Sequence, residues 1–535
     1  TGASNTAVGD NALGSNTTAS NNTAVGKEAL QANTTGAQNT AIGTFASNTN
    51  STGADNTVVG YAAMFLNTTG GQNVAVGRNA LNNNTVSNNT AVGYNALNAN
   101  TTGTQNTAVG GESLDANTTA NNNTGLGYRT LTANTTGAEN TAIGSAALKA
   151  NTTASSNTAV GRSALEVNTT GAENAAFGSN SLDANTTGSS NTALGYVALS
   201  GNTTGSSNTA VGHDSLVANT TASNNTAVGK DALKANTTGA SNTAVGRVAL
   251  DANTTGGNNV AVGNQSLGEN TTASQNVAVG DHALNKNTTA NNNTAVGYAA
   301  LFANTTGASN VAVGVNAGDA ITTGSLNVAI GLEALTAATT SGENTCVGGA
   351  AGRYIGSGQF NVAIGRSALH SALSGSTGQM TGSNNTAVGF DSLFSNTSGA
   401  DNVAVGAIAL DANTTGNQNI AIGKNCLGAN TTASFNVAMG QSALGVNTTG
   451  SENTAVGLQA LDANTTGSSG VAMGVNALTS NTTGNNNTSI GYATLLGNVN
   501  GGSNTAIGYN AGYGASVNGN VSGDNNTFIG FNAVG

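Results

Sequence analysis

The stretch NTAVGKEALQANTTGAQ, residues 22–38, contains the pattern that the rest of the chain repeats. Closely related blocks begin at 31 places, from Asn5 to Asn526, with Gly470 once in place of the first Asn. Of the 30 intervals between successive starts, 27 are 17 residues long and the others are 16, 24 and 22. A period this regular indicates one repeat array rather than several globular domains.

A repeat of 17 residues is too short for a helix pair or a propeller blade, and it suits one coil of a β-solenoid. The sequence therefore predicts an all-β, parallel solenoid over residues 1–535, on the order of 150 Å long at ~4.8 Å per stacked strand. Both ends fall inside a repeat, so we expect the array to be a segment of a longer chain.

Composition narrows the possible partners. Charged residues make up 7% of the chain, and 12 Lys and Arg against 23 Asp and Glu leave a net charge of −11. No basic stripe is present, so nucleic acid is not an expected partner. No run of 18 apolar residues occurs, so we expect no membrane insertion within this segment.

Each coil is numbered here from its first Asn, so that residues 22–38 are positions 1 to 17. Position 2 is Thr or Val, position 3 Ala, position 4 Val or another large apolar residue, position 5 Gly and position 9 Leu, as in Thr23, Ala24, Val25, Gly26 and Leu30. Because side chains alternate along a strand, we expect positions 2, 4 and 9 inside. Positions 3 and 5 would then form a smooth Ala/Gly surface against a neighbouring chain.

Two irregular coils provide a packing test. Leu at position 9 becomes Gly318 and Gly352, and in the same coils Asn at position 12 becomes Ile321 and Ile355. Since cores keep their total volume roughly constant, positions 9 and 12 should share one interior space. Asn33 and its equivalents would then stack inward as an amide ladder. The alternative is that Gly and Ile mark a locally different turn.

Charges, histidines and most tyrosines gather at variable positions. His213, His282 and His370 occupy positions 6, 7 and 10 of separate coils, and surface residues are the expected role. Cys346 and Cys426 replace Ala four coils apart, roughly 19 Å at ~4.8 Å per coil. That separation is too large for a disulfide and favours packing as small side chains.

The sequence contains none of the common catalytic or metal-binding motifs considered next. HExxH, CxxC, GxSxG, P-loop and calcium-nonapeptide motifs are absent from the sequence. Asp recurs at position 10 but alternates with Lys, Glu, Gln and Asn, which is too irregular for a metal column. We therefore expect no catalytic, cofactor-binding or metal-binding residues and no enzymatic activity. The Asp residues at position 10 include Asp115, Asp183, Asp251, Asp411 and Asp462.

The triplet Asn-Thr-Thr, as in residues 33–35, is a formal glycosylation sequon on most coils. Glycans about 4.8 Å apart would collide, and an inward Asn33 would be blocked from modification. This favours a prokaryotic or viral source.

The blocks NTAVGKEAL (residues 22–30) and NTAIGSAAL (residues 140–148) resemble the YadA-like head repeats of trimeric autotransporter adhesins. Similar arrays also look like parts of phage tail fibres. The resemblance implies a left-handed parallel β-roll, three chains side by side, on a bacterial cell surface or a virion. This repeat is longer by its Asn-Thr-Thr corner, and no heptad stalk, membrane anchor or terminal chaperone domain is visible.

These observations predict a non-enzymatic extracellular fibre or adhesin segment, with an unidentified host or abiotic surface as its ligand. A phage tail-fibre shaft is the second hypothesis. An ice-binding solenoid is the third, disfavoured because adjacent Thr34 and Thr35 should point to opposite sides. The period breaks at residues 370–381 and 513–521, which are either loops that carry selectivity or tolerated surface excursions.

Overall fold

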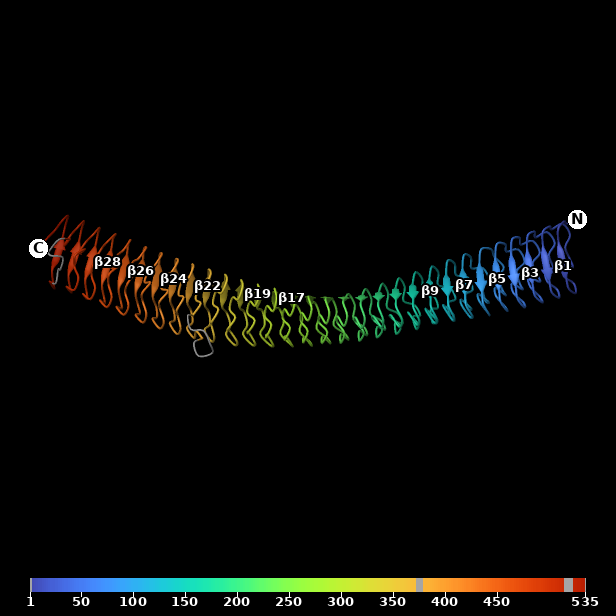
Figure 1. The fold of residues 1–535 in the computed structure, drawn as a ribbon, viewed down its shortest axis with the longest axis horizontal. Helices are drawn as coiled ribbons and strands as arrows, with labels where there is room; N and C mark the ends of the chain where they lie inside the picture. The colour runs from blue at the N-terminus through green and yellow to red at the C-terminus, as the bar shows by residue number, and fades with distance from the viewer. Residues whose placement is uncertain (1, 372–378, 514–522, 535) are drawn as a thin grey trace. The chain divides into compact units, whose positions relative to one another are not determined.

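The computed structural model describes residues 2–371, 379–513 and 523–534. The insertions expected to form loops fall largely on residues 372–378 and 514–522, which lie outside the described residues. Two compact units are distinguished, Thr1–Ala261 and Val262–Gly535. In each unit one short strand per coil follows another along the chain (Figure 1).

Every strand is three residues long and occupies positions 2 to 4 of its coil. The strands of the first unit are β1 (Thr6–Val8), β2 (Thr23–Val25), β3 (Thr40–Ile42), β4 (Thr57–Val59), β5 (Val74–Val76), β6 (Thr90–Val92), β7 (Thr107–Val109), β8 (Thr124–Leu126), β9 (Thr141–Ile143), β10 (Thr158–Val160), β11 (Ala175–Phe177), β12 (Thr192–Leu194), β13 (Thr209–Val211), β14 (Thr226–Val228) and β15 (Thr243–Val245).

β16 (Val260–Val262) spans the boundary between the units. The strands of the second unit are β17 (Val277–Val279), β18 (Thr294–Val296), β19 (Val311–Val313), β20 (Val328–Ile330), β21 (Thr345–Val347), β22 (Val362–Ile364), β23 (Thr386–Val388), β24 (Val403–Val405), β25 (Ile420–Ile422), β26 (Val437–Met439), β27 (Thr454–Val456), β28 (Val471–Met473), β29 (Thr488–Ile490), β30 (Thr505–Ile507) and β31 (Thr527–Ile529).

Within each unit every strand pairs in parallel with the next, and equivalent positions face each other. Thr158, Ala159 and Val160 of β10 pair with Ala175, Ala176 and Phe177 of β11, for example. The register continues through β22 and β23, where the intervening coil is 24 residues long. The predicted parallel, in-register β-solenoid is confirmed.

The assignment of the inner face was wrong for the strand. Ala24 at position 3 is fully buried, whereas Thr23 and Val25 at positions 2 and 4 are partly exposed. Leu30 at position 9 is fully buried, as expected. The Ala column therefore lines the interior of its own chain, and the larger apolar side chains point outward. Ala24 does not form the expected surface for a neighbouring chain.

Positive φ angles explain how a coil turns back with two consecutive residues inside. Ala29 and Leu30, at positions 8 and 9, are both fully buried, although neighbours in a strand would point to opposite sides. Glu28 and Leu30 adopt φ of 58° and 49°, the left-handed conformation that costs a non-glycine residue about 1–2 kcal/mol. Packing of the Leu side chain in the interior offsets this cost.

Glycine at position 5 meets two requirements at once. Gly26 has φ of 134°, and a Cβ there would lie 2.5 Å from the carbonyl oxygen of Gly43 in the next coil. A side chain at this position would meet both a strained backbone conformation and a collision with the next coil. The approaching backbone belongs to the same chain.

The interior contains two amide ladders. At position 12, Asn33 Nδ2 donates to Asn16 Oδ1 of the preceding coil at 3.1 Å and to Gly36 O at 2.9 Å. At position 1, Asn22 Nδ2 donates to the same Gly36 carbonyl at 3.0 Å, and Asn22 Oδ1 accepts the Asn39 amide at 2.9 Å. A buried amide left unbonded costs about 1–3 kcal/mol, so both ladders depend on the next coil being present. The first ladder was predicted and is confirmed; the second was not predicted.

Volume compensation between positions 9 and 12 is also confirmed. A Cβ on Gly318 would lie 3.0 Å from Ile321 Cδ1, and Ile321 is fully buried. Gly512, which has no Ile partner, is filled from the next coil instead: its Cβ would lie 3.1 Å from Phe528 Cδ2. Phe528 stands at position 3, where Ala is usual. Positions 3, 9 and 12 therefore share one narrow interior.

We predict that Ala159→Glu opens the solenoid locally, because it buries a carboxylate without a partner, at a cost of about 3 kcal/mol or more. Thr158→Glu, one residue earlier on the outward side, should leave the coil intact. Hydrogen exchange of residues 141–192, read by mass spectrometry, separates the two outcomes. Equal protection in both variants would contradict the interior position of Ala159.

A second prediction concerns the shared volume. Gly318→Leu alone should weaken its coil by about 1–3 kcal/mol, since Ile321 already fills the space. Ile321→Asn alone should leave a void. The double variant restores the common Leu and Asn pair and should regain most of the lost protection, a coupling that a double-mutant cycle measures. Additive losses over residues 310–326 would refute the shared interior.

Candidate binding surfaces

The first candidate surface is the outward side of the strands. Positions 2 and 4 form two parallel columns, because every strand repeats in register on the next. Position 2 holds Thr or Val in most coils, and position 4 is always a large apolar residue. In the second unit Met439 and Met473 remain 41% and 43% exposed. No charged side chain occurs in either column, so each unit presents a continuous apolar strip with a Thr-rich border.

The Asn-Thr-Thr corner forms the second surface. At position 13 the Thr34 hydroxyl donates to the Ser51 carbonyl of the next coil at 3.0 Å, and the Thr34 amide donates to the same carbonyl at 2.9 Å. Thr35 at position 14 is exposed. One Thr of each pair therefore supports coil stacking, and the other gives a single outward hydroxyl column. Asn33 is fully buried, which is consistent with the expected block to glycosylation.

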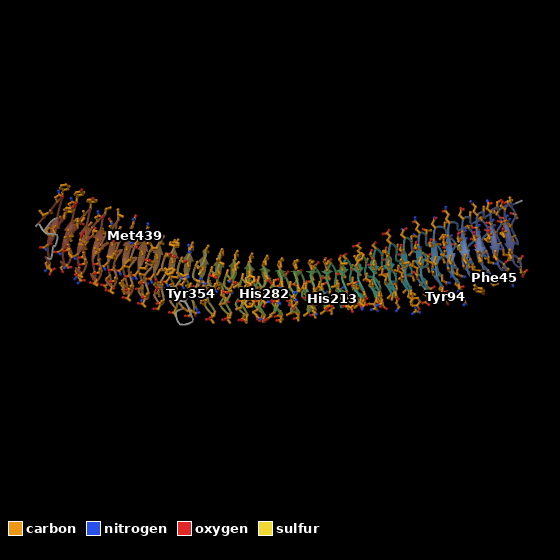
Figure 2. All side chains as sticks on the ribbon, in the orientation of Figure 1. Phe45, Tyr94, His213, His282, Tyr354 and Met439 are labelled. Atoms are coloured by element: carbon orange, nitrogen blue, oxygen red, sulfur yellow. The ribbon has the colours of Figure 1, made fainter. Side chains whose placement is uncertain are left out.

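The third surface carries the variable positions 6, 7 and 10. In Figure 2, Phe45, Tyr94 and His213 lie along one edge of the first unit, and His282 and Tyr354 along one edge of the second. Ion pairs between adjacent coils cross this surface. Examples are Arg129 Nε to Glu112 Oε2 at 2.6 Å, Lys149 Nζ to Glu166 Oε1 at 3.3 Å, and Arg353 to Glu333 at 2.9 Å. Such exposed pairs contribute little to stability, because solvent screens them.

The three histidines lie on this variable surface, each beside an aromatic ring. The His213 ring centroid is 5.3 Å from that of Tyr196. His370 is half-buried and stacks on Phe394, with centroids 4.9 Å apart and planes at 1°. Burial, followed by the charge of Arg353, lowers the pKa of His370. His370 is thus more buried than the sequence suggested, and its ring packs between the rings of Tyr354 and Phe394.

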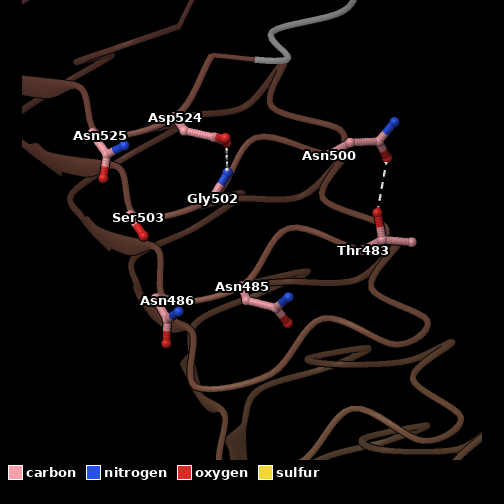
Figure 3. Close-up of a pocket in the computed structure, with 8 residues that line it drawn as sticks. All are labelled: Thr483, Asn485, Asn486, Asn500, Gly502, Ser503, Asp524 and Asn525. Atoms are coloured by element: carbon pink, nitrogen blue, oxygen red, sulfur yellow. Dashed lines mark hydrogen bonds between the residues drawn. The ribbon is translucent and has the colours of Figure 1, made fainter.

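A polar recess of about 320 Å³ lies near β29 and β30 and is lined mainly by Asn side chains. Figure 3 shows the residues that line it. Asp524 Oδ1 accepts the Gly502 amide at 2.6 Å. Ser155 Oγ does the same in an ordinary coil, accepting the Ala138 amide at 3.0 Å. Asp524 therefore takes over a backbone-capping role at position 16, and the recess follows from the coil geometry. Its lining residues are Thr483, Asn485, Asn486, Asn500, Gly502, Ser503, Asp524 and Asn525.

No group of three or more His, Cys, Asp or Glu side chains stands close enough to hold a metal ion within residues 2–371, 379–513 and 523–534. No helix that could cross a membrane is found in the same ranges. The carboxylates at position 10 stand apart, and burial raises the pKa of Asp115, Asp251 and Asp411.

A scan against protein-family models and a search of curated proteins both returned no match for this chain.

Sequence reasoning missed the outward columns as a surface, because it placed their side chains inside. The available signal was the exchange of volume between position 9 and position 3 of the next coil. Leu gives way to Ser47 where Val58 replaces Ala, and to Gly512 where Phe528 replaces Ala. Val58 is fully buried and Phe528 nearly so. These pairs identify position 3 as interior.

Both cysteines are free, buried packing residues, as predicted. Burial raises the pKa of the Cys346 and Cys426 thiols from 9.0 to about 12. Below pH 9 the folded and unfolded thiols are both protonated. Above pH 9 the unfolded thiol loses its proton first, so local stability should fall between pH 9 and 12.

We predict that both thiols resist a water-soluble disulfide reagent at pH 8 in the folded chain and react fully in denaturant. Their labelling rate should rise steeply between pH 9 and 12. Rapid labelling of Cys346 at pH 8 would show that its coil opens or that the thiol is accessible.

Proposed function

We propose that the chain is a non-enzymatic extracellular fibre segment, in which several parallel copies associate along their strands and present repeated outer surfaces for attachment. The observation that supports this most strongly is the pair of uncharged outward columns at positions 2 and 4. Monomeric proteins seldom expose continuous apolar strips of this extent. A second copy with the same repeat offers a matching strip, coil for coil, along its whole length.

Three copies are the number implied by the resemblance to the YadA-like heads of trimeric autotransporter adhesins. The observed strand orientation supports association through larger side chains. Val and Ile side chains in the outward columns supply apolar area, whereas the Ala and Gly surface expected from the sequence would supply little. The proposed interface thus consists of strand faces, and the variable positions 6, 7 and 10 remain outside it.

A phage tail-fibre shaft is the second candidate, and the same strip and coil geometry would serve it. An outer-membrane anchor in the same polypeptide would favour the adhesin, and a particle-attachment domain would favour the tail fibre. Both candidates place the chain outside a cell.

An ice-binding surface is a third candidate, and one observation now favours it more than the sequence did. The strand Thr-Ala-Val places Thr and Val on the same outward side, which gives two columns rather than one. However, position 4 varies from Val to Phe177 and Met439. A lattice of water molecules requires a regular surface, whereas a flexible apolar interface accommodates such differences. Association between copies therefore fits the columns better.

We predict that the purified chain is an oligomer by light scattering, and that Met439→Lys together with Met473→Lys weakens it by placing charge on the strip. The matched control is Gln441→Lys, two residues from Met439 at the exposed position 6, which should leave assembly unchanged. A stable monomer in the unmutated chain would overturn the proposed association. Thermal hysteresis in ice by that monomer would favour the ice-binding candidate.

The attachment part is tested separately. Beads that carry the full chain, and bare beads, are exposed to glass, polystyrene and extracellular matrix under flow. Greater retention of the coated beads is expected on at least one surface. Equal retention throughout would remove the adhesive role and leave a structural fibre.

A further inference from the structure

One aromatic arrangement occurs twice on the variable surface, once in each unit. The sequence Tyr-Ala-Ala-Met-Phe at residues 61–65 matches Tyr-Ala-Ala-Leu-Phe at residues 298–302. In both, Tyr stands at position 6, Ala at position 7 and Phe at position 10 of one coil. The preceding coil has an aromatic ring at position 7, Phe45 or His282, and the following coil has an Asn there, Asn79 or Asn316.

Each copy forms its own cluster of three rings, and the two clusters have similar geometry. His282 lies 6.4 Å from Tyr298 and 6.2 Å from Phe302 between ring centroids, with planes inclined at 62° and 49°. Phe45 lies 6.0 Å from Tyr61 and 6.2 Å from Phe65, with planes at 77° and 89°. Rings at positions 6 and 10 of one coil thus converge on the ring at position 7 of the coil before.

The small Ala at position 7 creates the space between these rings. In the second unit a pocket of about 460 Å³ lies over Ala299, lined by His282, Tyr298, Phe302 and Asn316. Tyr298 is 54% exposed, so the pocket opens to solvent. Aromatic walls with a few polar groups in a volume of roughly 300–1,000 Å³ are typical of small-ligand sites.

We propose that the pocket over Ala299 binds the pyranose ring of a neutral carbohydrate, and that the cluster around Ala62 is a second copy of this site. A β-linked glucopyranose carries axial C–H groups on its faces, which pack against aromatic rings, and hydroxyls at its edge, which hydrogen-bond to an amide. Tyr298 and Phe302 supply the rings, and the Asn316 side chain supplies the amide. His282 closes the pocket from the preceding coil.

The two sites differ in the charged groups beside their rings: at the second, Asp281 Oδ1 lies 2.9 Å from His282 Nδ1. At the first, Lys27 Nζ lies 6.0 Å from the Phe45 ring centroid and the Arg78 guanidinium 5.7 Å from that of Tyr61. These cations compete with a sugar for the ring faces. A shallow pocket of this kind binds weakly, and two copies per chain in an oligomer would act together. The inference rests on the proposed adhesive function for its role, but not for the binding itself.

The test is saturation-transfer NMR on the full chain in solution, with methyl β-D-glucopyranoside and cellobiose as probes. Transfer to the axial C–H protons is expected, at millimolar concentrations of sugar. Phe302→Leu should weaken binding at least about five-fold, because it removes a ring and keeps apolar volume. The chain itself has Leu496 at the equivalent position after Tyr492 and Ala493, so the fold tolerates this residue.

Two controls make the outcome decisive. The first is Tyr94→Ala. Tyr94 also stands at position 6, but positions 7 and 10 of its coil are Asn95 and Asn98 rather than Ala and Phe. Its removal should leave saturation transfer unchanged. Phe65→Leu with Phe302→Leu should abolish what the single variant retains. The proposal is overturned if neither probe receives saturation transfer, or if Tyr94→Ala loses as much transfer as Phe302→Leu. Because this assay needs no surface, sugar binding without bead attachment would refute adhesion alone, and attachment without sugar binding would refute this site.

Discussion

The stacking of each coil on an identical neighbour is the constraint on which the structure depends. The interior is too narrow for a conventional apolar core, and a large share of it consists of Asn side chains. Asn33 and its equivalents can be buried only because the coils before and after supply the amide partners. The position-1 ladder adds a contact from the Asn22 side chain to the next backbone. A single coil would leave these groups unpaired, so the array forms as a whole.

This requirement fixes which positions can vary. Any side chain that enters the interior must fit against the equivalent residue one coil away, which explains why Ala is usual at position 3 and why volume is exchanged among positions 3, 9 and 12. Positions 6, 7 and 10 lie in the turn that follows the position-5 glycine of each coil, and they have solvent on one side. The chain places its histidines and most of its charges and tyrosines there, so many of the differences between coils appear on that surface. The strand face, by contrast, repeats without charge, which suits association with another copy.

The proposed functions follow from this division. In the proposal, the uncharged strand columns supply a long interface of low specificity, and the aromatic clusters around Ala62 and Ala299 supply local sites on a repetitive surface. Neither depends on catalytic groups. The two halves of the proposal use different faces of the coil, so association along the strands leaves positions 6, 7 and 10 free to contact a ligand.

The sequence by itself determined the period, the parallel stacking, the buried Leu column and the inward Asn33, because each follows from spacing or from a residue type with one physical use. The aromatic motif is also present in the sequence, as Tyr-Ala-Ala-Met-Phe at residues 61–65 and Tyr-Ala-Ala-Leu-Phe at residues 298–302. Only the tertiary structure decided which side of the three-residue strand faces inward. Alternation allows either Ala24 or the pair Thr23 and Val25 inside, and hydropathy favoured the larger residues. The space opposite Leu30 and Asn33 admits a methyl group and little more, and that limit appears only when the coil closes on itself.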